Sequence, residues 1–188
     1  MLTALQQRKL KTLFNNIDAD SGGTLNQDDF HLILNKLSIS RGLKPNSWQY
    51  AYLRSILVSM WNNLSLADQN SDAEITLEEW FKYYDNLIHS DAYEPLIQLQ
   101  CDVFFALLDE DDNGEISQQE YVDLVSAYGV DATWARENFY HLDLNSDGHL
   151  SQEELFTLMD EFFRSDNPKS PGNYFWGWLT DKSLRAKP

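Results

Sequence analysis

The stretch Asp109–Glu120 (DEDDNGEISQQE) decides how this sequence is interpreted, because oxygen-bearing side chains stand at regular places within twelve residues. Asp109, Asp111, Asn113 and Glu120 occupy positions 1, 3, 5 and 12 of the stretch. Gly114 at position 6 permits a sharp turn that a Cβ atom would hinder. Carboxylate, amide and carbonyl oxygens are the ligands that a hard divalent cation prefers.

The same register recurs three more times along the chain. The other stretches are Asp18–Asp29 (DADSGGTLNQDD), Asp68–Glu79 (DQNSDAEITLEE) and Asp143–Glu154 (DLNSDGHLSQEE). Each begins with Asp, carries Asp or Asn at position 3 and ends with a carboxylate at position 12. One match could arise by chance as a solvated acidic surface, but four in register between helical patterns are typical of metal-binding loops.

The pattern is that of the EF-hand calcium loop, in which side chains at positions 1, 3, 5 and 12 and the backbone carbonyl of position 7 surround one Ca²⁺. The predicted ligands are Asp18, Asp20, Thr24, Asn26 and Asp29 in loop one, Asp68, Asn70, Asp72, Glu74 and Glu79 in loop two, Asp109, Asp111, Asn113, Glu115 and Glu120 in loop three, and Asp143, Asn145, Asp147, His149 and Glu154 in loop four. At position 7 only the backbone is expected to ligate.

The four loops are not equivalent. Loops three and four match at every position, so both are expected to bind Ca²⁺. Loop one has Gly22 at position 5 and the shorter Asp29 at position 12, which favours Mg²⁺ more than the other loops do, since Mg²⁺ prefers six ligands at shorter distances. Loop two has Ala73 where glycine is usual, which costs strain at a left-handed position. We expect three or four bound Ca²⁺ ions, with Mg²⁺ possible in loop one.

The negative charge of the chain is concentrated in the four loops. The chain has 14 Lys and Arg against 30 Asp and Glu, a net charge of −16, and 19 of the carboxylates lie in the four loops. The rest of the chain is nearly neutral, with a net of +3. Such a protein should repel nucleic acid and anionic membrane surfaces. One cysteine, Cys101, excludes an intramolecular disulfide, and no apolar run reaches the ~18 residues of a membrane span. We expect a cytoplasmic protein, monomeric, without nucleic-acid or membrane partners.

Apolar residues at helical spacing flank every loop, which predicts an all-α fold of eight helices in two EF-hand pairs packed into one compact body. The predicted units are an N-terminal pair over residues 1–90, with loops 18–29 and 68–79, a C-terminal pair over residues 91–165, with loops 109–120 and 143–154, and a tail over residues 166–188 that packs on the body. Residues at position 8 should pair across the loops in short β bridges. The segment from His89 to Pro95 is interpreted as a linker, with Pro95 opening the next helix.

At this level of detail the sequence resembles the sarcoplasmic calcium-binding proteins and their bacterial relative calerythrin, over nearly the whole chain. The resemblance is carried by the 50-residue spacing of the first two loops, the non-glycine position 6 of loop two and the tail residues Gly172, Asn173, Phe175, Trp176 and Gly177. It implies a compact cytosolic calcium buffer. Animal members often have a degenerate fourth loop, whereas Asp143–Glu154 is intact, as in the bacterial relatives.

Two alternatives remain open from the sequence. Coelenterazine photoproteins and luciferin-binding proteins belong to the same superfamily and enclose an apolar ligand among aromatics. The 25 aromatic residues here are better explained as core, and the terminal Pro188 is weak support for a photoprotein. A calcium sensor would expose a Met-rich groove, but the chain has only 3 Met. No catalytic constellation can be assembled, so we predict a buffer and not an enzyme.

Overall fold

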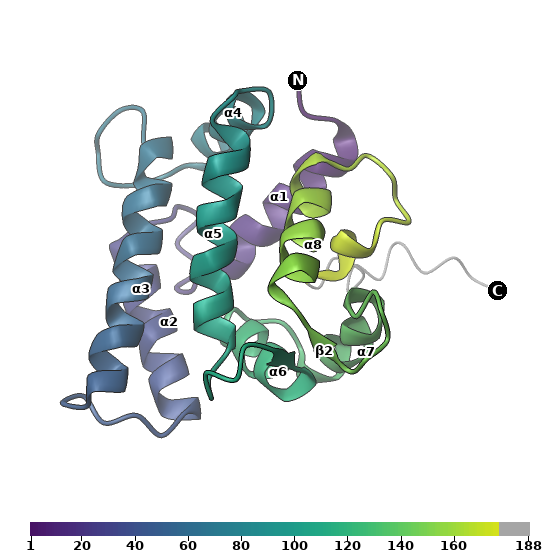
Figure 1. Cartoon of the computed structure of the whole chain (residues 1–188). Helices are drawn as coiled ribbons and strands as arrows, with labels where there is room; N and C mark the ends of the chain where they lie inside the picture. The colour runs from purple at the N-terminus through teal and green to yellow at the C-terminus, as the bar shows by residue number, and fades with distance from the viewer. Residues whose placement is uncertain (177–188) are drawn as a thin grey trace.

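The computed structural model describes residues 1–176, and within them it contains eight α-helices and two very short strands (Figure 1). The helices are α1 (Ala4–Ile17), α2 (Gln27–Ser40), α3 (Trp48–Leu64), α4 (Leu77–Ile88), α5 (Tyr93–Leu108), α6 (Gln118–Ala127), α7 (Ala132–Leu142) and α8 (Gln152–Arg164). The strands are β1 (Ile116–Ser117) and β2 (His149–Leu150), and two 3₁₀ turns are η1 (Ser65–Ala67) and η2 (Pro171–Tyr174). The predicted all-α fold with eight helices is confirmed.

Side-chain caps explain where most helices begin. Thr3 and Gln6 form the predicted capping box at α1, Ser47 caps α3, and Asp131 caps α7 by accepting from the backbone N–H groups of Thr133 and Trp134. One boundary differs from the prediction. Helix α5 begins at Tyr93, so Pro95 lies inside the first turn, where backbone N–H groups have no intrahelical acceptor and proline removes nothing.

The metal loops pair as position 8 predicted. Leu25 and Ile75 form an antiparallel bridge between loops one and two, with N–H···O distances of 2.9 and 2.8 Å. In loops three and four, β1 and β2 pair antiparallel with Ile116 opposite Leu150. All four of these side chains are fully buried, so each bridge ties its pair of loops to the core.

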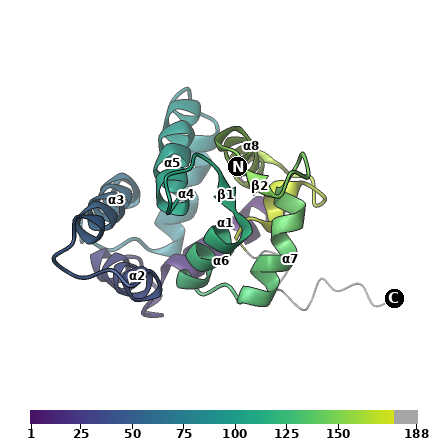
Figure 2. The same ribbon diagram turned by 60° about the horizontal axis from the view of Figure 1, so that its bottom comes forward.

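The helices of both halves share one core, and α5 lies between α3 and α8 in both views (Figures 1 and 2). The Tyr84 ring from α4 stacks on the Phe163 ring from α8, with centroids 5.0 Å apart and an interplanar angle of 5°. The indole N–H of Trp80 in α4 donates to the Leu10 carbonyl in α1 at 3.0 Å. Because aromatics from both halves pack together, the molecule is one compact body and not a dumbbell. None of the described helices is long and apolar enough to cross a membrane.

The segment after α8 folds back over the body. Trp176 is buried, with its ring 5.1 Å from that of Phe104, and its carbonyl accepts from the side chain of Asn16 at 3.0 Å. The carbonyl of the buried Phe175 accepts from the Tyr121 hydroxyl at 2.7 Å. The rest of the predicted tail, residues 177–188 with Gly177 and Pro188, lies outside the described residues.

Candidate metal sites

Each loop is wound around its first aspartate. In all four, the backbone N–H of position 6 donates to Oδ2 of the position 1 Asp, at distances of 2.8 to 3.0 Å. The position 3 oxygen accepts from the N–H of position 5 in every loop. These local bonds turn the backbone around the carboxylate of position 1 and the side-chain oxygen of position 3 in every loop. The wrapping follows from residues at most five apart and needs no tertiary contact.

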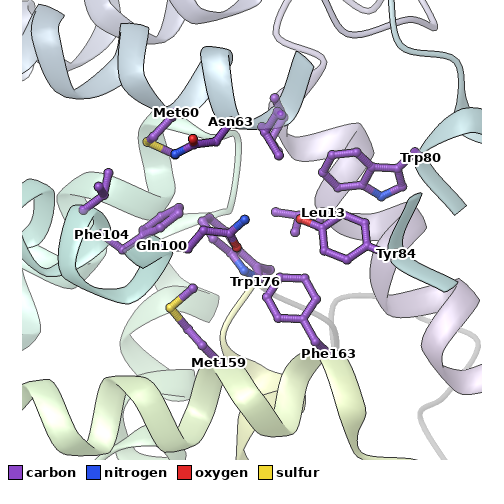
Figure 3. Close-up of a pocket in the computed structure, with 13 residues that line it drawn as sticks. Leu13, Met60, Asn63, Trp80, Tyr84, Gln100, Phe104, Met159, Phe163 and Trp176 are labelled. Atoms are coloured by element: carbon purple, nitrogen blue, oxygen red, sulfur yellow. The ribbon is translucent and has the colours of Figure 1, made fainter. Parts of the chain in front are cut away.

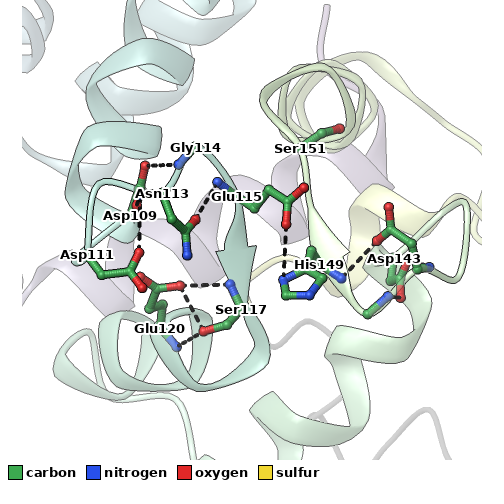
Figure 4. Close-up of polar contacts among 12 residues, drawn as sticks. Asp109, Asp111, Asn113, Gly114, Glu115, Ser117, Glu120, Asp143, His149 and Ser151 are labelled. Carbon is green, nitrogen blue, oxygen red and sulfur yellow. Dashed lines mark hydrogen bonds and ion pairs between the residues drawn. The ribbon is translucent and has the colours of Figure 1, made fainter.

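The carboxylate at position 12 closes each loop from the helix that follows it. In loop three, Oε1 of Glu120 accepts from the N–H of Glu110 at 2.8 Å, while Oε2 accepts from the N–H and hydroxyl of Ser117 (Figure 4). Glu154 joins the same two sides of loop four, through Leu144 and Ser151. Two oxygens of one carboxylate are therefore held at the mouth of the loop, as bidentate chelation requires.

Carboxylates converge most closely in loops one and three. Oxygens of Asp18, Asp20 and Asp29 lie within 4.8 Å of one another, and so do single oxygens of Asp109, Asp111 and Glu120. Loops two and four also have three carboxylates among positions 1, 3, 5 and 12, but theirs stand at position 5 and not at position 3, where both loops have Asn. Only oxygen donors converge, and like charges this close repel until a cation neutralises them. The donor set therefore fits a hard divalent cation of the Ca²⁺ or Mg²⁺ type.

Position 9 has a role that the sequence analysis missed. Thr76, Ser117 and Ser151 are the N-caps of α4, α6 and α8, and each forms a capping box with the position 12 glutamate. Asn26, which was predicted as a ligand, caps α2 by accepting from the N–H of Asp28 at 2.8 Å. The signal was present in the sequence, because positions 9 and 12 have the S/T-x-x-E spacing of a capping box.

Hydrogen bonding and burial shift the pKa values of the closing carboxylates in opposite directions. The N–H and hydroxyl of Thr76 lower the pKa of Glu79. Burial raises the pKa of Asp29, against backbone N–H donors at Asn26, Asp20 and Ala19 that lower it. Asp29 is fully buried, so the charged form of this carboxylate is the one that most needs a counter-ion.

The side chains at position 7 of loops three and four contact each other. Nδ1 of His149 lies 3.6 Å from a carboxylate oxygen of Glu115, so the two side chains face each other across the paired loops and form an ion pair when the imidazole is protonated (Figure 4). Both side chains are about half exposed, with 46% and 58% of their surface accessible. The backbone carbonyl at position 7 remains the predicted ligand.

An apolar cavity lies apart from the loops, where the two halves meet. It has a volume of about 40 Å³ and is bounded by aromatic residues that include Trp80, Tyr84, Phe163 and Trp176 (Figure 3). Asn63 and Gln100 supply polar groups at its wall, and no histidine lines it. The aromatics therefore fill most of the core, as expected, and leave room for a few water-sized molecules.

Comparison with known proteins agrees with this geometry. A model of the EF-hand family matches residues 138–159. Calerythrin from Saccharopolyspora erythraea is 25% identical over 86% of this chain and 94% of its own length. A sarcoplasmic calcium-binding protein from Perinereis vancaurica tetradentata is 28% identical over 92% of this chain and 97% of its own. Among solved structures, the calcium-loaded apo form of coelenterazine-binding protein from Renilla muelleri has a TM-score of 0.77 at 22% identity and covers 94% of this chain and 99% of its own.

The fold and the four loops define the class: this chain is an EF-hand calcium-binding protein. Within that class it is similar to calerythrin and the sarcoplasmic calcium-binding proteins.

Proposed function

We propose that this protein is a cytoplasmic Ca²⁺ buffer that binds one ion in each of its four loops. The observation that carries the proposal is the shared geometry of the loops: in all four, position 6 donates to the first aspartate, and the position 12 carboxylate spans from the start of the loop to position 9. The proposed ligands are the side chains at positions 1, 3, 5 and 12, apart from Gly22 at position 5 of loop one, and the carbonyl at position 7. The protein acts by binding alone, as a monomer, without catalysis.

Calorimetric titration with Ca²⁺ tests the proposal. Glu120→Gln and Glu154→Gln are each expected to lower the number of bound ions by one, because the amide cannot chelate as a bidentate anion. Glu153→Gln is the matched control, since this exposed residue at position 11 also loses one charge but lies outside the ligand set. Equal stoichiometry in the wild type and in both position 12 variants would contradict the proposal.

A buffering role, as opposed to a sensing one, is supported by where the methionines lie. Met60 and Met159 are buried at the apolar cavity, and Met1 is at the chain end, so flexible thioethers do not gather on the described surface. The surface that a sensor would use here is a groove of about 730 Å³ between α3 and α5, where Trp48 and Tyr52 are exposed. A hydrophobic dye decides between the roles: a large Ca²⁺-induced rise in its fluorescence on a folded apo protein favours a sensor.

We also propose that loop one selects Mg²⁺ more than the other loops do. Gly22 offers no side-chain ligand at position 5, and its N–H donates instead to Asp18 and Asp20 at 2.9 and 2.7 Å. Millimolar Mg²⁺ should therefore suppress Ca²⁺ binding at loop one and not at loops three and four. Gly22→Asp restores the missing oxygen and should reduce this competition; Mg²⁺ that competes equally at every loop would contradict the selectivity.

A second candidate function is storage of a small apolar ligand between the halves, for which the cavity of about 40 Å³ would have to widen on binding. It is favoured by the aromatic lining in Figure 3 and by the fold shared with a coelenterazine-binding protein. The test is titration with coelenterazine, followed by tryptophan quenching and by light emission on adding Ca²⁺. Gln100→Leu and Asn63→Leu should then change the affinity, because they remove the polar groups at the cavity wall. Absence of quenching excludes this candidate.

A further inference from the structure

Arg41 joins the N-terminal half of the molecule to loop three. It is the C-cap residue of α2, and only 9% of its side chain is exposed. Nη2 donates to the Leu107 carbonyl at 2.7 Å, and Nε lies 3.3 Å from Oε2 of Glu110 as an ion pair. The planar guanidinium can hold two acceptors at once, which a lysine ammonium on a flexible stem does less well.

The two partners of Arg41, one hydrogen-bonded and one ion-paired, stand on either side of the first ligand of loop three. Leu107 is the penultimate residue of α5, so its carbonyl is one of those that have no partner inside the helix. Glu110 follows the position 1 residue Asp109, and its N–H donates to the closing carboxylate of Glu120 at 2.8 Å. Arg41 therefore bonds the backbone before Asp109, at Leu107, and pairs after it with the side chain of Glu110, whose N–H anchors Glu120.

The other end of α2 belongs to loop one. Asp29, the closing carboxylate of that loop, is the third residue of the helix, where it accepts from the N–H groups of Ala19 and Asn26, both at 2.9 Å. Helix α2 has 14 residues, so its two ends are about 21 Å apart. One helix and its C-cap thus bear the last ligand of loop one and the side chain that contacts the start of loop three. In Figure 1 both α2 and α5 end near the bottom of the view.

We propose that α2 couples calcium binding in loop one to calcium binding in loop three through Arg41. The coupling is positive: an ion in one loop raises the affinity of the other loop for Ca²⁺. This rests on the proposed function, because both loops must bind the ion. Ca²⁺ in loop one holds Asp29 and therefore the position of α2, which keeps Arg41 on Leu107 and Glu110. Loop three then has less freedom to lose when it binds its own ion, and by reciprocity loop three favours loop one equally.

If only charge mattered, Arg41 would weaken Ca²⁺ binding at loop three, which is the opposite of the effect proposed here. A lone guanidinium beside a metal loop repels the cation, but here Glu110 offsets its charge at 3.3 Å. Removing Arg41 would therefore strengthen binding at loop three if charge dominated, and would weaken it if the guanidinium acts by positioning the loop. The two effects are distinguishable in a measurement that is specific for each loop.

In loops one and three a backbone amide can report on Ca²⁺ binding. The N–H groups of Gly23 and Gly114 donate to Oδ2 of Asp18 and Asp109, both at 3.0 Å, so their amide NMR signals should move when Ca²⁺ binds those carboxylates. Calcium titrations of ¹⁵N-labelled protein then give separate affinities for loops one and three. Asp20→Ala disables loop one at an exposed residue, and the Gly23 signal verifies the loss.

We expect Asp20→Ala to weaken Ca²⁺ binding at loop three at least fivefold when Arg41 is present and less than twofold in Arg41→Gln. Lys36→Gln is the matched control, because it removes one positive charge from an exposed position on the same helix, and it should keep the full fivefold effect. Arg41→Lys, which retains the charge without the planar fork, should keep part of it. Glu110→Gln should reduce the effect of Asp20→Ala on loop three as Arg41→Gln does. It replaces Arg41→Gln in the experiment if that variant does not fold.

An equal effect of Asp20→Ala with and without Arg41 overturns the coupling while the proposed function stands. Tighter binding at loop three in Arg41→Gln also overturns it, since charge then outweighs positioning. A Gly114 signal that does not respond to Ca²⁺ in the wild type overturns the proposed function at loop three, and the coupling with it.

Discussion

At the scale of single residues, Ala73 shows how one substitution changes a metal loop. Its φ is +67°, in the region where Gly23, Gly114 and Gly148 of the other loops have φ between +84° and +91°. Its N–H still donates to the first aspartate of the loop, Asp68, at 3.0 Å. The loop thus keeps its hydrogen bonds, and the strain of a Cβ atom in the left-handed region remains as a cost of about 1 to 2 kcal/mol.

Ala73→Gly should therefore raise the free energy of unfolding by about 1 kcal/mol, after allowing for the greater backbone entropy of glycine in the unfolded chain. Urea denaturation without Ca²⁺ measures it, and loop two should also bind Ca²⁺ more tightly. Ala92→Gly is a control of opposite sign, because exposed Ala92 has an ordinary φ of −78°. A loss of stability in Ala73→Gly would show that the left-handed position is not strained.

Gly172 is a second position where a single methyl group matters. A Cβ atom there would lie 2.4 Å from the Leu158 carbonyl oxygen and 2.7 Å from Cβ of Glu161 on α8. Its N–H donates to the Glu161 carboxylate at 2.9 Å, so the segment before Trp176 rests directly on the helix. No side chain fits without moving this backbone.

Gly172→Ala is expected to destabilise the protein by about 1 to 3 kcal/mol, the usual cost of overpacking. The emission spectrum of the protein should shift as Trp176 becomes more exposed, and the denaturation midpoint should fall. Gly22→Ala is the matched control, since a Cβ there meets only the flexible carboxylate of Asp20 at 2.8 Å. Equal effects of the two substitutions would contradict the close approach.

At the scale of elements, α1 caps the end of α8. The fully buried Lys9 donates to the Glu161 and Ser165 carbonyls at 3.0 and 2.7 Å, and its Nζ lies 5.6 Å from the centroid of the Phe162 ring. The Gln6 side chain donates to the carbonyls of Phe163 and Arg164, the last two residues of α8. A cation at a helix C-terminus is favoured by the helix dipole. Burial nevertheless lowers the pKa of Lys9 to about 8.

This lowered pKa predicts a pH dependence. Between about pH 8 and 10.5 the unfolded chain keeps the Lys9 proton more than the folded chain does, so stability gains up to about 3 kcal/mol as pH rises through this window. Burial raises the pKa of Tyr84, Tyr121 and Tyr128, which lowers stability above about pH 10. Comparison with Lys9→Met cancels the tyrosine effect.

Urea denaturation of the wild type and Lys9→Met across pH 7 to 10.5 measures the difference. It should grow with pH in favour of the wild type. Lys11→Met on the exposed side of the same helix is the control, because its ammonium stays in water. A difference that does not change with pH would contradict the lowered pKa of Lys9 in the folded protein.

At the scale of the whole molecule, charge and stability are linked through the loops. Nineteen carboxylates in four short loops repel one another when no cation is present, and the buried Asp29 is the least solvated of the closing carboxylates. A cation that binds only the folded state stabilises it by mass action, by about 2.7 kcal/mol for each site at a free concentration one hundred times the dissociation constant.

Chelation should therefore lower the melting temperature measured by scanning calorimetry, and added Ca²⁺ should restore it. Sodium chloride at equal ionic strength is the control, because it screens surface repulsion without filling the sites. An unchanged melting temperature on adding a chelator would mean that the loops do not bind the ion in the folded protein.

Much of the local structure could be predicted from the sequence. The capping residues Thr3, Ser47 and Asp131 and the bridge partners at position 8 all lie where their spacing indicated. The start of α5 was wrong by two residues, because a proline in the first turn resembles a proline that opens a helix. The second use of position 9 as a helix cap was missed because metal ligation and capping call for the same oxygen-bearing residues.

By itself, the sequence determined everything that acts over a few residues: the four loops, their hydrogen-bonded turns, the caps and the helical stripes. Only the tertiary structure decided which helix ends meet, as Arg41 does with Leu107 across 66 residues, Lys9 with Glu161 across 152 and Asn16 with Trp176 across 160. The physical reason is range. A loop or a cap needs partners three to five residues apart, which leave a repeating pattern, whereas a buried cation on a distant carbonyl depends on how the helices pack and leaves no such pattern in the chain.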